Sequence, residues 1–496
     1  MTPSKDTAAH RHAIVLLAAW GAVSAALLVF AWNAWPIPSG DAGTFVPPML
    51  TWARGEGLVN CVWPASQLHD PTGQQRLVSH GFLFPMIVGS LAPQANFQSI
   101  ALVVGVLHSA TLGLWAVIFW WIRETITPGR CSWWSTTAGF LSLVGLATFL
   151  MGFEGRPEPF VVFLLGLGVA SLFVVRISRS WIVLGCLVGA LAATHPIACL
   201  LCGLVVAGYG AWVLPAGRWI LWLAKVGAVS LLVFAALFSW YPYSLRDWVA
   251  GCLHHSAQVM GRPPSGGFFY YWITAPQLTG YGFVYLLGGC ILAAFLYFRR
   301  GEAQCRAGVM VSSAALVAAS YYFGGQTPAR NYNVLMAAPL IYCLIFGAVC
   351  AACQQASRYR VFLVVALMVV GLSGAGFCRA VTIFPSFLKR GVKLEEGRQR
   401  LAELRKQVSG PVWLDGGLFP LVDNCRGVSF SDQDMFNAEA ILLQQADHAM
   451  IEPPAILGYF LLESKFDLQV PRLLGVKLAN SVRGYNYAIY LKGQKP

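Results

Sequence analysis

The pattern of hydrophobic and polar positions divides most of the chain into eleven apolar segments with short polar connections. Each segment has about 20 residues where the run allows, the length that an α-helix needs to cross a bilayer. We expect membrane spans over residues 13–35, 98–122, 133–151, 158–175, 180–195, 196–215, 222–240, 279–298, 307–323, 333–353 and 361–379. The fifth and sixth form one charge-free run interrupted by Thr194-His195-Pro196. Because that run is too long for one crossing, the sequence predicts a tight hairpin there.

Two regions depart from this pattern. Gly81–Ala92 is apolar but has only 12 residues, too few to cross, which favours a helix lying at the outer membrane interface. After Pro385 the composition becomes that of a soluble protein, with helical spacing and alternating charge over 393–408. Short strands are expected over residues 411–415, 448–452 and 485–491.

The predicted fold is therefore an all-α polytopic membrane protein with about 11 transmembrane helices and a small C-terminal α/β extracytoplasmic domain. The membrane domain covers residues 1–385, and its first outer loop, over 36–97, contains interfacial helices. The soluble domain covers residues 386–496.

Composition agrees with this assignment. The 496 residues are 57% hydrophobic and 11% charged, whereas soluble domains carry about 25% charged residues. Residues 1–385 hold 20 of the 34 Lys and Arg but 9 of the 21 Asp and Glu, so this part carries +11 of the net +13. Such an excess reflects membrane topology and contact with anionic lipid, and it does not indicate a nucleic-acid partner.

The basic residues also predict an orientation. With the N-terminus inside, thirteen basic residues fall in the inner loops and six in the outer loops, as the positive-inside rule requires. An odd number of spans then places the C-terminal domain outside. The first segment lacks a small-residue cleavage site and should remain as a signal anchor. Because the chain has no Asn-x-Ser/Thr sequence, we expect a bacterial inner membrane, a cytoplasmic N-terminus and a periplasmic C-terminal domain.

The longest polar interruption before residue 380 is the stretch from Pro36 to Ser90. Ionised groups near an apolar phase are costly, so the few acids of the membrane domain are informative. The outer acids are Asp41, Glu56, Asp70, Glu154, Glu158 and Asp247. The outer cations and histidines are Arg54, Arg76, His80, Arg156, His195, His254, His255, Arg262 and Arg330. Carboxylates that face cations at a lipid–water boundary suit a lipid-linked phosphate and a hydroxyl to be deprotonated.

Each of these residues also has a structural interpretation. Asp41 could cap a helix or form a turn, and an acid at a helix start, such as Glu154 or Glu158, is favoured by the helix dipole. Arg156 could simply pair with either glutamate. His195 precedes a proline and could be a turn residue.

Other motifs favour a structural reading more strongly. The His254-His255 pair is more typical of a solvated loop than of a metal site. Asp70-Pro-Thr-Gly is a common turn sequence. Cys199-Leu-Leu-Cys202 and Cys350-Ala-Ala-Cys353 have metal or redox spacing, but each lies in an apolar segment without polar partners.

Four local features resemble the polytopic GT-C glycosyltransferases that use polyprenyl-phosphate sugars, a group that includes the protein O-mannosyltransferases and the lipid A aminoarabinose transferases. An acid follows the first span in Gly40-Asp41, with Arg54-Gly-Glu56 further on, and His80-Gly-Phe-Leu-Phe-Pro85 leads into an interfacial segment. Arg156-Pro157-Glu158 opens the fourth span, with Thr194-His195-Pro196 at a later hairpin. Arg330-Asn-Tyr332 enters a late span.

The resemblance implies inverting transfer of a sugar from a polyprenyl-phosphate donor to an envelope glycan, lipid or protein acceptor. Asp41 becomes the expected base, with Glu158 and Glu154 as further catalytic acids. The residues implied for substrate binding are Arg54, His80, Arg156, His195, Arg262, Arg330 and Tyr332. No cofactor is firmly implied. Many relatives have two adjacent acids after the first span, whereas Ala42 follows Asp41 here, so a divalent metal would need Glu154 or Glu158 and that question stays open.

Two other functions compete with the transferase. A transporter or flippase of lipid-linked sugars would place polar groups at mid-membrane on broken helices in related halves. The predicted spans are nearly free of ionisable groups at mid-span, and the second half shows no repeat of the first. A non-catalytic subunit of an envelope complex, with the C-terminal domain as its binding part, is opposed only by the clustered outer acids. An Asp41 substitution distinguishes them, since assembly should survive it and catalysis should not.

Overall fold

A computed structural model of the chain describes residues 5–33, 42–63, 68–126, 133–150, 155–175, 177–260, 346, 350, 394–422, 428–430, 437–444, 459–463, 472–473, 476–477 and 487–493. Its membrane-domain helices are α1 (Lys5–Trp32), α2 (Ala42–Ala53), α3 (Leu83–Leu91), α4 (Phe97–Ile126), α5 (Trp133–Leu150), α6 (Glu158–Val174), α7 (Ile177–Thr194), α8 (Pro196–Val213), α9 (Ala216–Phe238) and α10 (Leu245–Met260).

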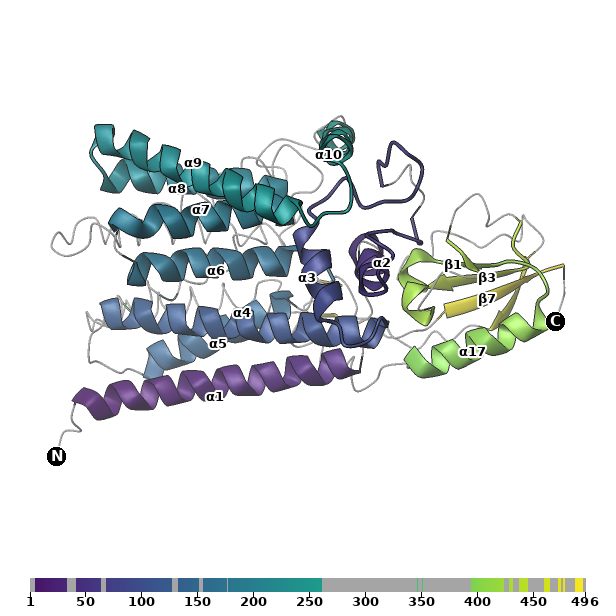
Figure 1. Cartoon of the computed structure of the whole chain (residues 1–496). Helices are drawn as coiled ribbons and strands as arrows, with labels where there is room; N and C mark the ends of the chain where they lie inside the picture. Colours follow the sequence, from purple (N-terminus) through teal and green to yellow (C-terminus); the bar gives the residue numbers. More distant parts are fainter. Residues whose placement is uncertain are drawn as a thin grey trace.

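The long helices form a bundle. Figure 1 shows α1 and α4 to α9 running side by side, with α2, α3 and α10 gathered at one end and the N-terminus at the other. Within the described residues, Ala13–Trp32, Phe97–Glu124 and Gly217–Phe238 are long and apolar enough to cross a membrane, and Glu158–Ser171 and Arg179–Thr194 are shorter apolar helices. The chain is thus an integral membrane protein.

Small residues bring these helices together. A Cβ at Gly185 would lie 2.6 Å from the side chain of Val229, and one at Gly189 would lie 2.6 Å from the carbonyl of Ser230, so α7 and α9 approach closely at both glycines. The Ser230 hydroxyl donates to the carbonyl of Gly185 at 3.1 Å. Apolar helices in lipid gain little from hydrophobic burial against each other, and close packing at small residues with interhelical hydrogen bonds supplies the attraction.

The first seven predicted segments coincide with α1, α4, α5, α6, α7, α8 and α9. The predicted hairpin is confirmed: α7 ends at Thr194, α8 begins at Pro196, and the two helices are in contact. The segments predicted over 279–298, 307–323 and 361–379 lie outside the described residues, and of 333–353 only Phe346 and Cys350 are described, both helical. The count of eleven spans stays a prediction.

The first outer loop contains a helix that its sequence argues against. α2 includes Pro47 and Pro48, which lack the N–H groups that would bond to the carbonyls four residues earlier. The buried side-chain amide of Asn60 supplies both missing donors, at 2.8 Å to Gly43 and 3.0 Å to Thr44. The second helix of this loop is α3, of nine residues, at the site of the predicted interfacial helix.

The C-terminal elements are α17 (Leu394–Gln407), the 3₁₀ helix η3 (Gly416–Leu421), β1 (Val412–Leu414), β2 (Val428–Ser429), β3 (Ala440–Gln444), β4 (Tyr459–Glu463), β5 (Arg472–Leu473), β6 (Val476–Lys477) and β7 (Tyr487–Lys492). One sheet has the order β2-β1-β3-β7-β4, with β1 parallel to β2 and β3 and with β7 antiparallel to β3 and β4. α17, β1 and β7 fall where the sequence predicts a helix and two strands. The predicted strand over 448–452 lies outside the described residues, and the domain boundary at 385/386 stays a prediction.

These elements lie beyond the end of the bundle that carries α2, α3 and α10 (Figure 1). Phe419 of η3 packs edge-on against Phe97 at the start of α4, with ring centroids 5.8 Å apart. The helix α2 of the first loop also contacts η3, so it lies between the bundle and the C-terminal elements.

Candidate active site

The first loop meets the corner between α7 and α8. The Phe82 N–H donates to the carbonyl of Ala193 at 2.8 Å, and a Cβ at Gly81 would overlap the carbonyl of Thr194. From the other side the Trp248 indole of α10 donates to the carbonyl of His80 at 3.0 Å. The short segment around His80 is thus held between two elements that are distant in the sequence.

A buried ion pair opens α6 at this end of the bundle. The guanidinium of Arg156 donates to both oxygens of Glu158, Nε to Oε2 at 3.1 Å and Nη2 to Oε1 at 2.6 Å. Glu158 is 1% exposed and Arg156 is 9% exposed. Gly155, with φ 75°, makes the turn before the pair. The predicted pairing of Arg156 with one of the two glutamates therefore holds for Glu158, and the bidentate geometry fixes the carboxylate plane.

Phe45 of α2, within the first loop, lies close to both Arg156 and His80. Its ring centroid is 5.1 Å from that of His80, and the guanidinium carbon of Arg156 lies 5.8 Å from the ring. The structure therefore brings together His80, Arg156 and Glu158, three residues that the sequence proposed separately.

His195 also belongs to this group. Its Nδ1 accepts a hydrogen bond from the Ala198 N–H at 3.3 Å and so caps the N-terminus of α8, which is the turn role foreseen for it. Burial lowers the pKa of His195, and the nearby charges of Glu158 and Arg156 act on that pKa in opposite directions. Since Nδ1 is an acceptor in this arrangement, neutral His195 carries its proton on Nε2, and that N–H is the donor left for a ligand.

Four histidines cluster next to the pair. The ring centroid of His255 lies 4.6 Å from that of His80 and 5.0 Å from that of His69, and His254 lies 5.1 Å from His69. The predicted loop for His254-His255 is wrong, because both residues belong to α10. His254 is exposed, as expected for a solvated residue, whereas His255 is half-buried against His80. Burial, with His255 and Arg156 nearby, holds the pKa of His80 well below its ordinary value, so the ring is neutral at pH 7.

A second ion network joins the first loop to α10. Arg76 donates to Asp70, with Nη2 at 2.9 Å from Oδ1, and its Nη1 lies 3.0 Å from Asp247. Burial alone would raise the pKa of Asp70, but hydrogen bonds from Arg76 and Thr72 lower it to about 2. The Thr72 N–H donates to Asp70 Oδ1 at 3.0 Å, so Asp70-Pro-Thr-Gly is the turn that the sequence predicts.

Several candidates are not brought to this site by the described structure. Asp41, Glu154, Arg262, Arg330 and Tyr332 lie outside the described residues. Arg54 is half-buried, and its Nη2 donates to the carbonyl of Ala95 at 3.3 Å, a contact that ties α2 to the segment before α4.

Other features were not foreseen. Cys61 is disulfide-bonded, which its isolated position in the sequence did not indicate. His69 joins the histidine cluster although no local motif marks it. Among the described residues, no group of three or more His, Cys, Asp or Glu side chains is arranged to hold a metal ion.

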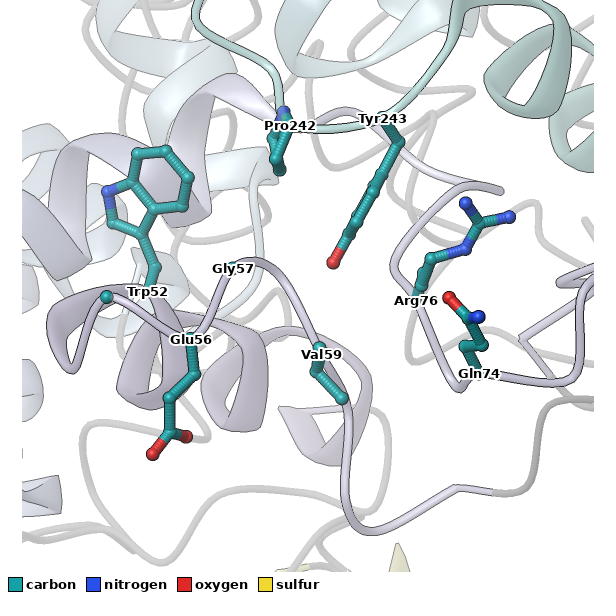
Figure 2. Close-up of a pocket in the computed structure, with 9 residues that line it drawn as sticks. Trp52, Glu56, Gly57, Val59, Gln74, Arg76, Pro242 and Tyr243 are labelled. Carbon is teal, nitrogen blue, oxygen red and sulfur yellow. The ribbon is translucent and has the colours of Figure 1, made fainter.

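A cavity of about 530 Å³ opens beside the ion network (Figure 2). Trp52 and Tyr243 stand on opposite sides of it, with Gly57 on the backbone between them. Glu56 and Gln74 also line it.

No protein-family model and no curated protein matches the sequence. In solved structures the chain is similar to ArnT from Cupriavidus metallidurans bound to undecaprenyl phosphate, with a TM-score of 0.53, 12% identity, 97% of this chain covered and 99% of that one. The apo state of ArnT gives a TM-score of 0.52 at 13% identity, covering 96% and 99%.

The apo oligosaccharyltransferase from Archaeoglobus fulgidus is also similar, with a TM-score of 0.51 and 12% identity, covering 85% of this chain and 64% of that one. ArnT is an aminoarabinose transferase, and both proteins have the GT-C fold. The resemblance that the motifs indicated is therefore confirmed in three dimensions: the chain has the GT-C fold of these membrane glycosyltransferases.

Proposed function

We propose that the protein is an integral membrane glycosyltransferase that moves a sugar from a polyprenyl-phosphate donor to an envelope glycan, lipid or protein acceptor, with inversion. The observation that carries this proposal is the buried Arg156–Glu158 pair, set at the end of a GT-C bundle where the first loop, the α7–α8 corner and α10 meet. The undecaprenyl phosphate bound by ArnT supports the class of donor.

In the proposed reaction the acceptor hydroxyl attacks the anomeric carbon while Asp41 accepts its proton. The bond between that carbon and the lipid phosphate oxygen breaks, and its electron pair leaves with the phosphate. Asp41 directly precedes Ala42, where α2 begins, and Phe45 of that helix lies against His80 and Arg156. This proximity in the chain supports Asp41 as the base.

The remaining residues would stabilise the departing phosphate. Arg330 is the proposed cation, because Arg156 already shares its charge with Glu158. His80 and His195 would serve as neutral hydrogen-bond donors, in keeping with the lowered pKa of His80. Arg54, Arg262 and Tyr332 remain candidates for contacts with the sugar or lipid, and Glu154 for a second acid.

The orientation belongs to the same proposal. We place the first loop and the C-terminal elements on the periplasmic side of a bacterial inner membrane, with the N-terminus in the cytoplasm. The disulfide at Cys61 supports an oxidising compartment for the first loop.

The test is a transfer assay with the purified protein in lipid nanodiscs and extracted polyprenyl-phosphate sugars as donor. Mass spectrometry of lipid-linked sugars and envelope glycans from cells with and without the gene identifies donor and acceptor. Asp41→Asn keeps the side-chain size, and we expect a folded protein whose transfer rate is about 10²–10⁴ lower. A transporter would instead move lipid-linked sugars without joining them to an acceptor, and normal transfer by both Asp41→Asn and Glu158→Gln would refute the proposed mechanism.

A further inference from the structure

The cavity beside Arg76 lies outside the group formed by His80, Arg156 and Glu158. Its volume of about 530 Å³ falls within the roughly 300–1,000 Å³ that is usual for small-molecule sites. Figure 2 shows Trp52 and Tyr243 facing the cavity from opposite sides, with the Tyr243 hydroxyl directed toward the backbone of Gly57 and Val59.

Both aromatic walls are fixed in position. The Trp52 indole N–H donates to the Ser90 hydroxyl at 2.8 Å. The Tyr243 ring packs edge-on against Tyr241 at 5.3 Å, and the Arg76 guanidinium lies 5.0 Å from its centroid. Because these side chains are already held in place, binding a ligand would cost little conformational entropy. This favours binding of a small ligand, which makes few contacts.

The backbone between these walls has a form that only glycine adopts readily. Gly55 and Gly57 have φ of 75° and 83°, in the left-handed region. A Cβ at Gly57 would lie 3.2 Å from the Tyr243 hydroxyl, whereas one at Gly55 would meet nothing within 4 Å. Gly57 therefore keeps the floor of the cavity open beside Tyr243.

The charges around the cavity disfavour an anion. Arg76 is the cation in its lining, and its guanidinium already contacts the carboxylates of Asp70 and Asp247. Glu56 adds a third carboxylate at the exposed edge. A phosphate here would be repelled, because the site carries more negative than positive charge. We therefore expect the lipid phosphate to bind elsewhere.

We infer that this cavity is a saccharide-binding subsite that takes a sugar ring of the acceptor. A pyranose ring presents C–H-bearing faces that pack on aromatic rings, and its hydroxyls can bond to the Tyr243 hydroxyl and to the amide of Gln74. An amino sugar would add an ammonium group that suits the carboxylates and the aromatic faces. The assignment to the acceptor rests on the proposed function, whereas saccharide binding itself does not.

The experiment measures binding without turnover. Saturation-transfer difference NMR on the full chain in nanodiscs uses methyl β-D-glucoside and methyl β-D-glucosaminide as probes and inorganic phosphate as competitor. We expect saturation transfer to a sugar probe that phosphate does not displace. Trp52→Ala should weaken binding about tenfold, the effect of losing one aromatic contact of roughly 1.4 kcal/mol. Trp32→Ala, at a tryptophan 63% exposed at the end of α1, should leave binding unchanged.

The matched pair Gly57→Ala and Gly73→Ala separates cavity filling from backbone strain, because Gly73 of the same loop also has a left-handed φ, 74°, and open space around its Cβ but does not line the cavity. Both place a side chain at a left-handed φ, so both should lower the melting temperature, but only Gly57→Ala should weaken sugar binding. Equal binding by the two variants, displacement by phosphate, or a sugar signal independent of Trp52 would overturn the inference.

The outcomes also separate this inference from the proposed function. Sugar binding by a protein without transfer activity would keep the subsite and refute the transferase. Transfer with an acceptor KM that Gly57→Ala leaves unchanged would refute the subsite alone.

Discussion

The backbone of Gly81 lies directly against the carbonyl of Thr194, with no room for a side chain between them. This contact joins the first loop to the last residue of α7, next to the hydrogen bond from the Phe82 N–H to the Ala193 carbonyl. Both partners are backbone groups, so neither can rotate away from an added methyl. The fit therefore sets the position of His80 relative to His195.

We predict that Gly81→Ala separates the first loop from the α7–α8 corner. Overpacking of this kind costs about 1–3 kcal/mol, and the displaced His80 should reduce transfer activity as well. Thermal unfolding of the purified protein in detergent measures the first effect. Gly21→Ala in α1 is the control, since a Cβ there meets nothing within 4 Å, and its melting temperature should not fall. Equal melting temperatures for the two variants would show that the contact is not rigid.

Asn60→Asp should destabilise the first loop strongly. The Asn60 amide donates to the carbonyls of Gly43 and Thr44, and its Oδ1 accepts from the N–H groups of Val62 and Trp63. Aspartate keeps the acceptor but replaces the donor, leaving two carbonyls facing a carboxylate. Each buried polar group left unsatisfied costs about 1–3 kcal/mol. Limited proteolysis of the first loop should accelerate, whereas Asn33→Asp, at the end of α1, should leave its rate unchanged.

Substitutions of Arg156 and Glu158 should have non-additive effects on the free energy of unfolding. Removing one partner, as in Arg156→Met or Glu158→Leu, leaves a buried charge uncompensated and should cost about 3–5 kcal/mol. The double replacement should cost much less than the sum, because no charge then remains buried. All three variants should lose transfer activity. If the loss of unfolding free energy in the double variant equalled the sum of the two single losses, the two side chains would not be coupled.

Acidification should destabilise the protein through His80. Burial keeps the pKa of His80 well below its ordinary value of about 6.5, so below pH 6.5 the unfolded chain takes up a proton that the folded chain does not. The stability from neutral His80 is present above pH 6.5 and is lost as the pH falls below it. We expect the melting temperature to drop between pH 7 and pH 5, and to drop less over the same range in His80→Gln. An unchanged slope in that variant would assign the effect to other groups, such as His69.

The sequence predicts most helix boundaries well, but it does not predict the contacts between elements that are distant in the chain. Thr194-His195-Pro196 marks a helix break because proline cannot continue the preceding helix, and Glu158 marks a helix start. The helix α2 could not be foreseen, because Pro47 and Pro48 argue against it and the compensating Asn60 lies outside the helix. The histidine cluster was equally hidden, since His80 meets His255 only after α4 to α9 have folded between them.

The contact between Trp248 and the carbonyl of His80 spans 168 residues and fixes an order of events during synthesis. The first loop is synthesised long before α10, so its histidines and Arg76 cannot make these contacts until α10 has been made. Only when α10 arrives does the indole of Trp248 reach His80, and Asp247 reach Arg76 at 3.0 Å. A chain interrupted before residue 245 would insert its helices without completing this end of the bundle. Assembly of this end of the bundle therefore has to follow the synthesis of α4 to α10, and the first loop is the earliest-made part of it and the last to be completed.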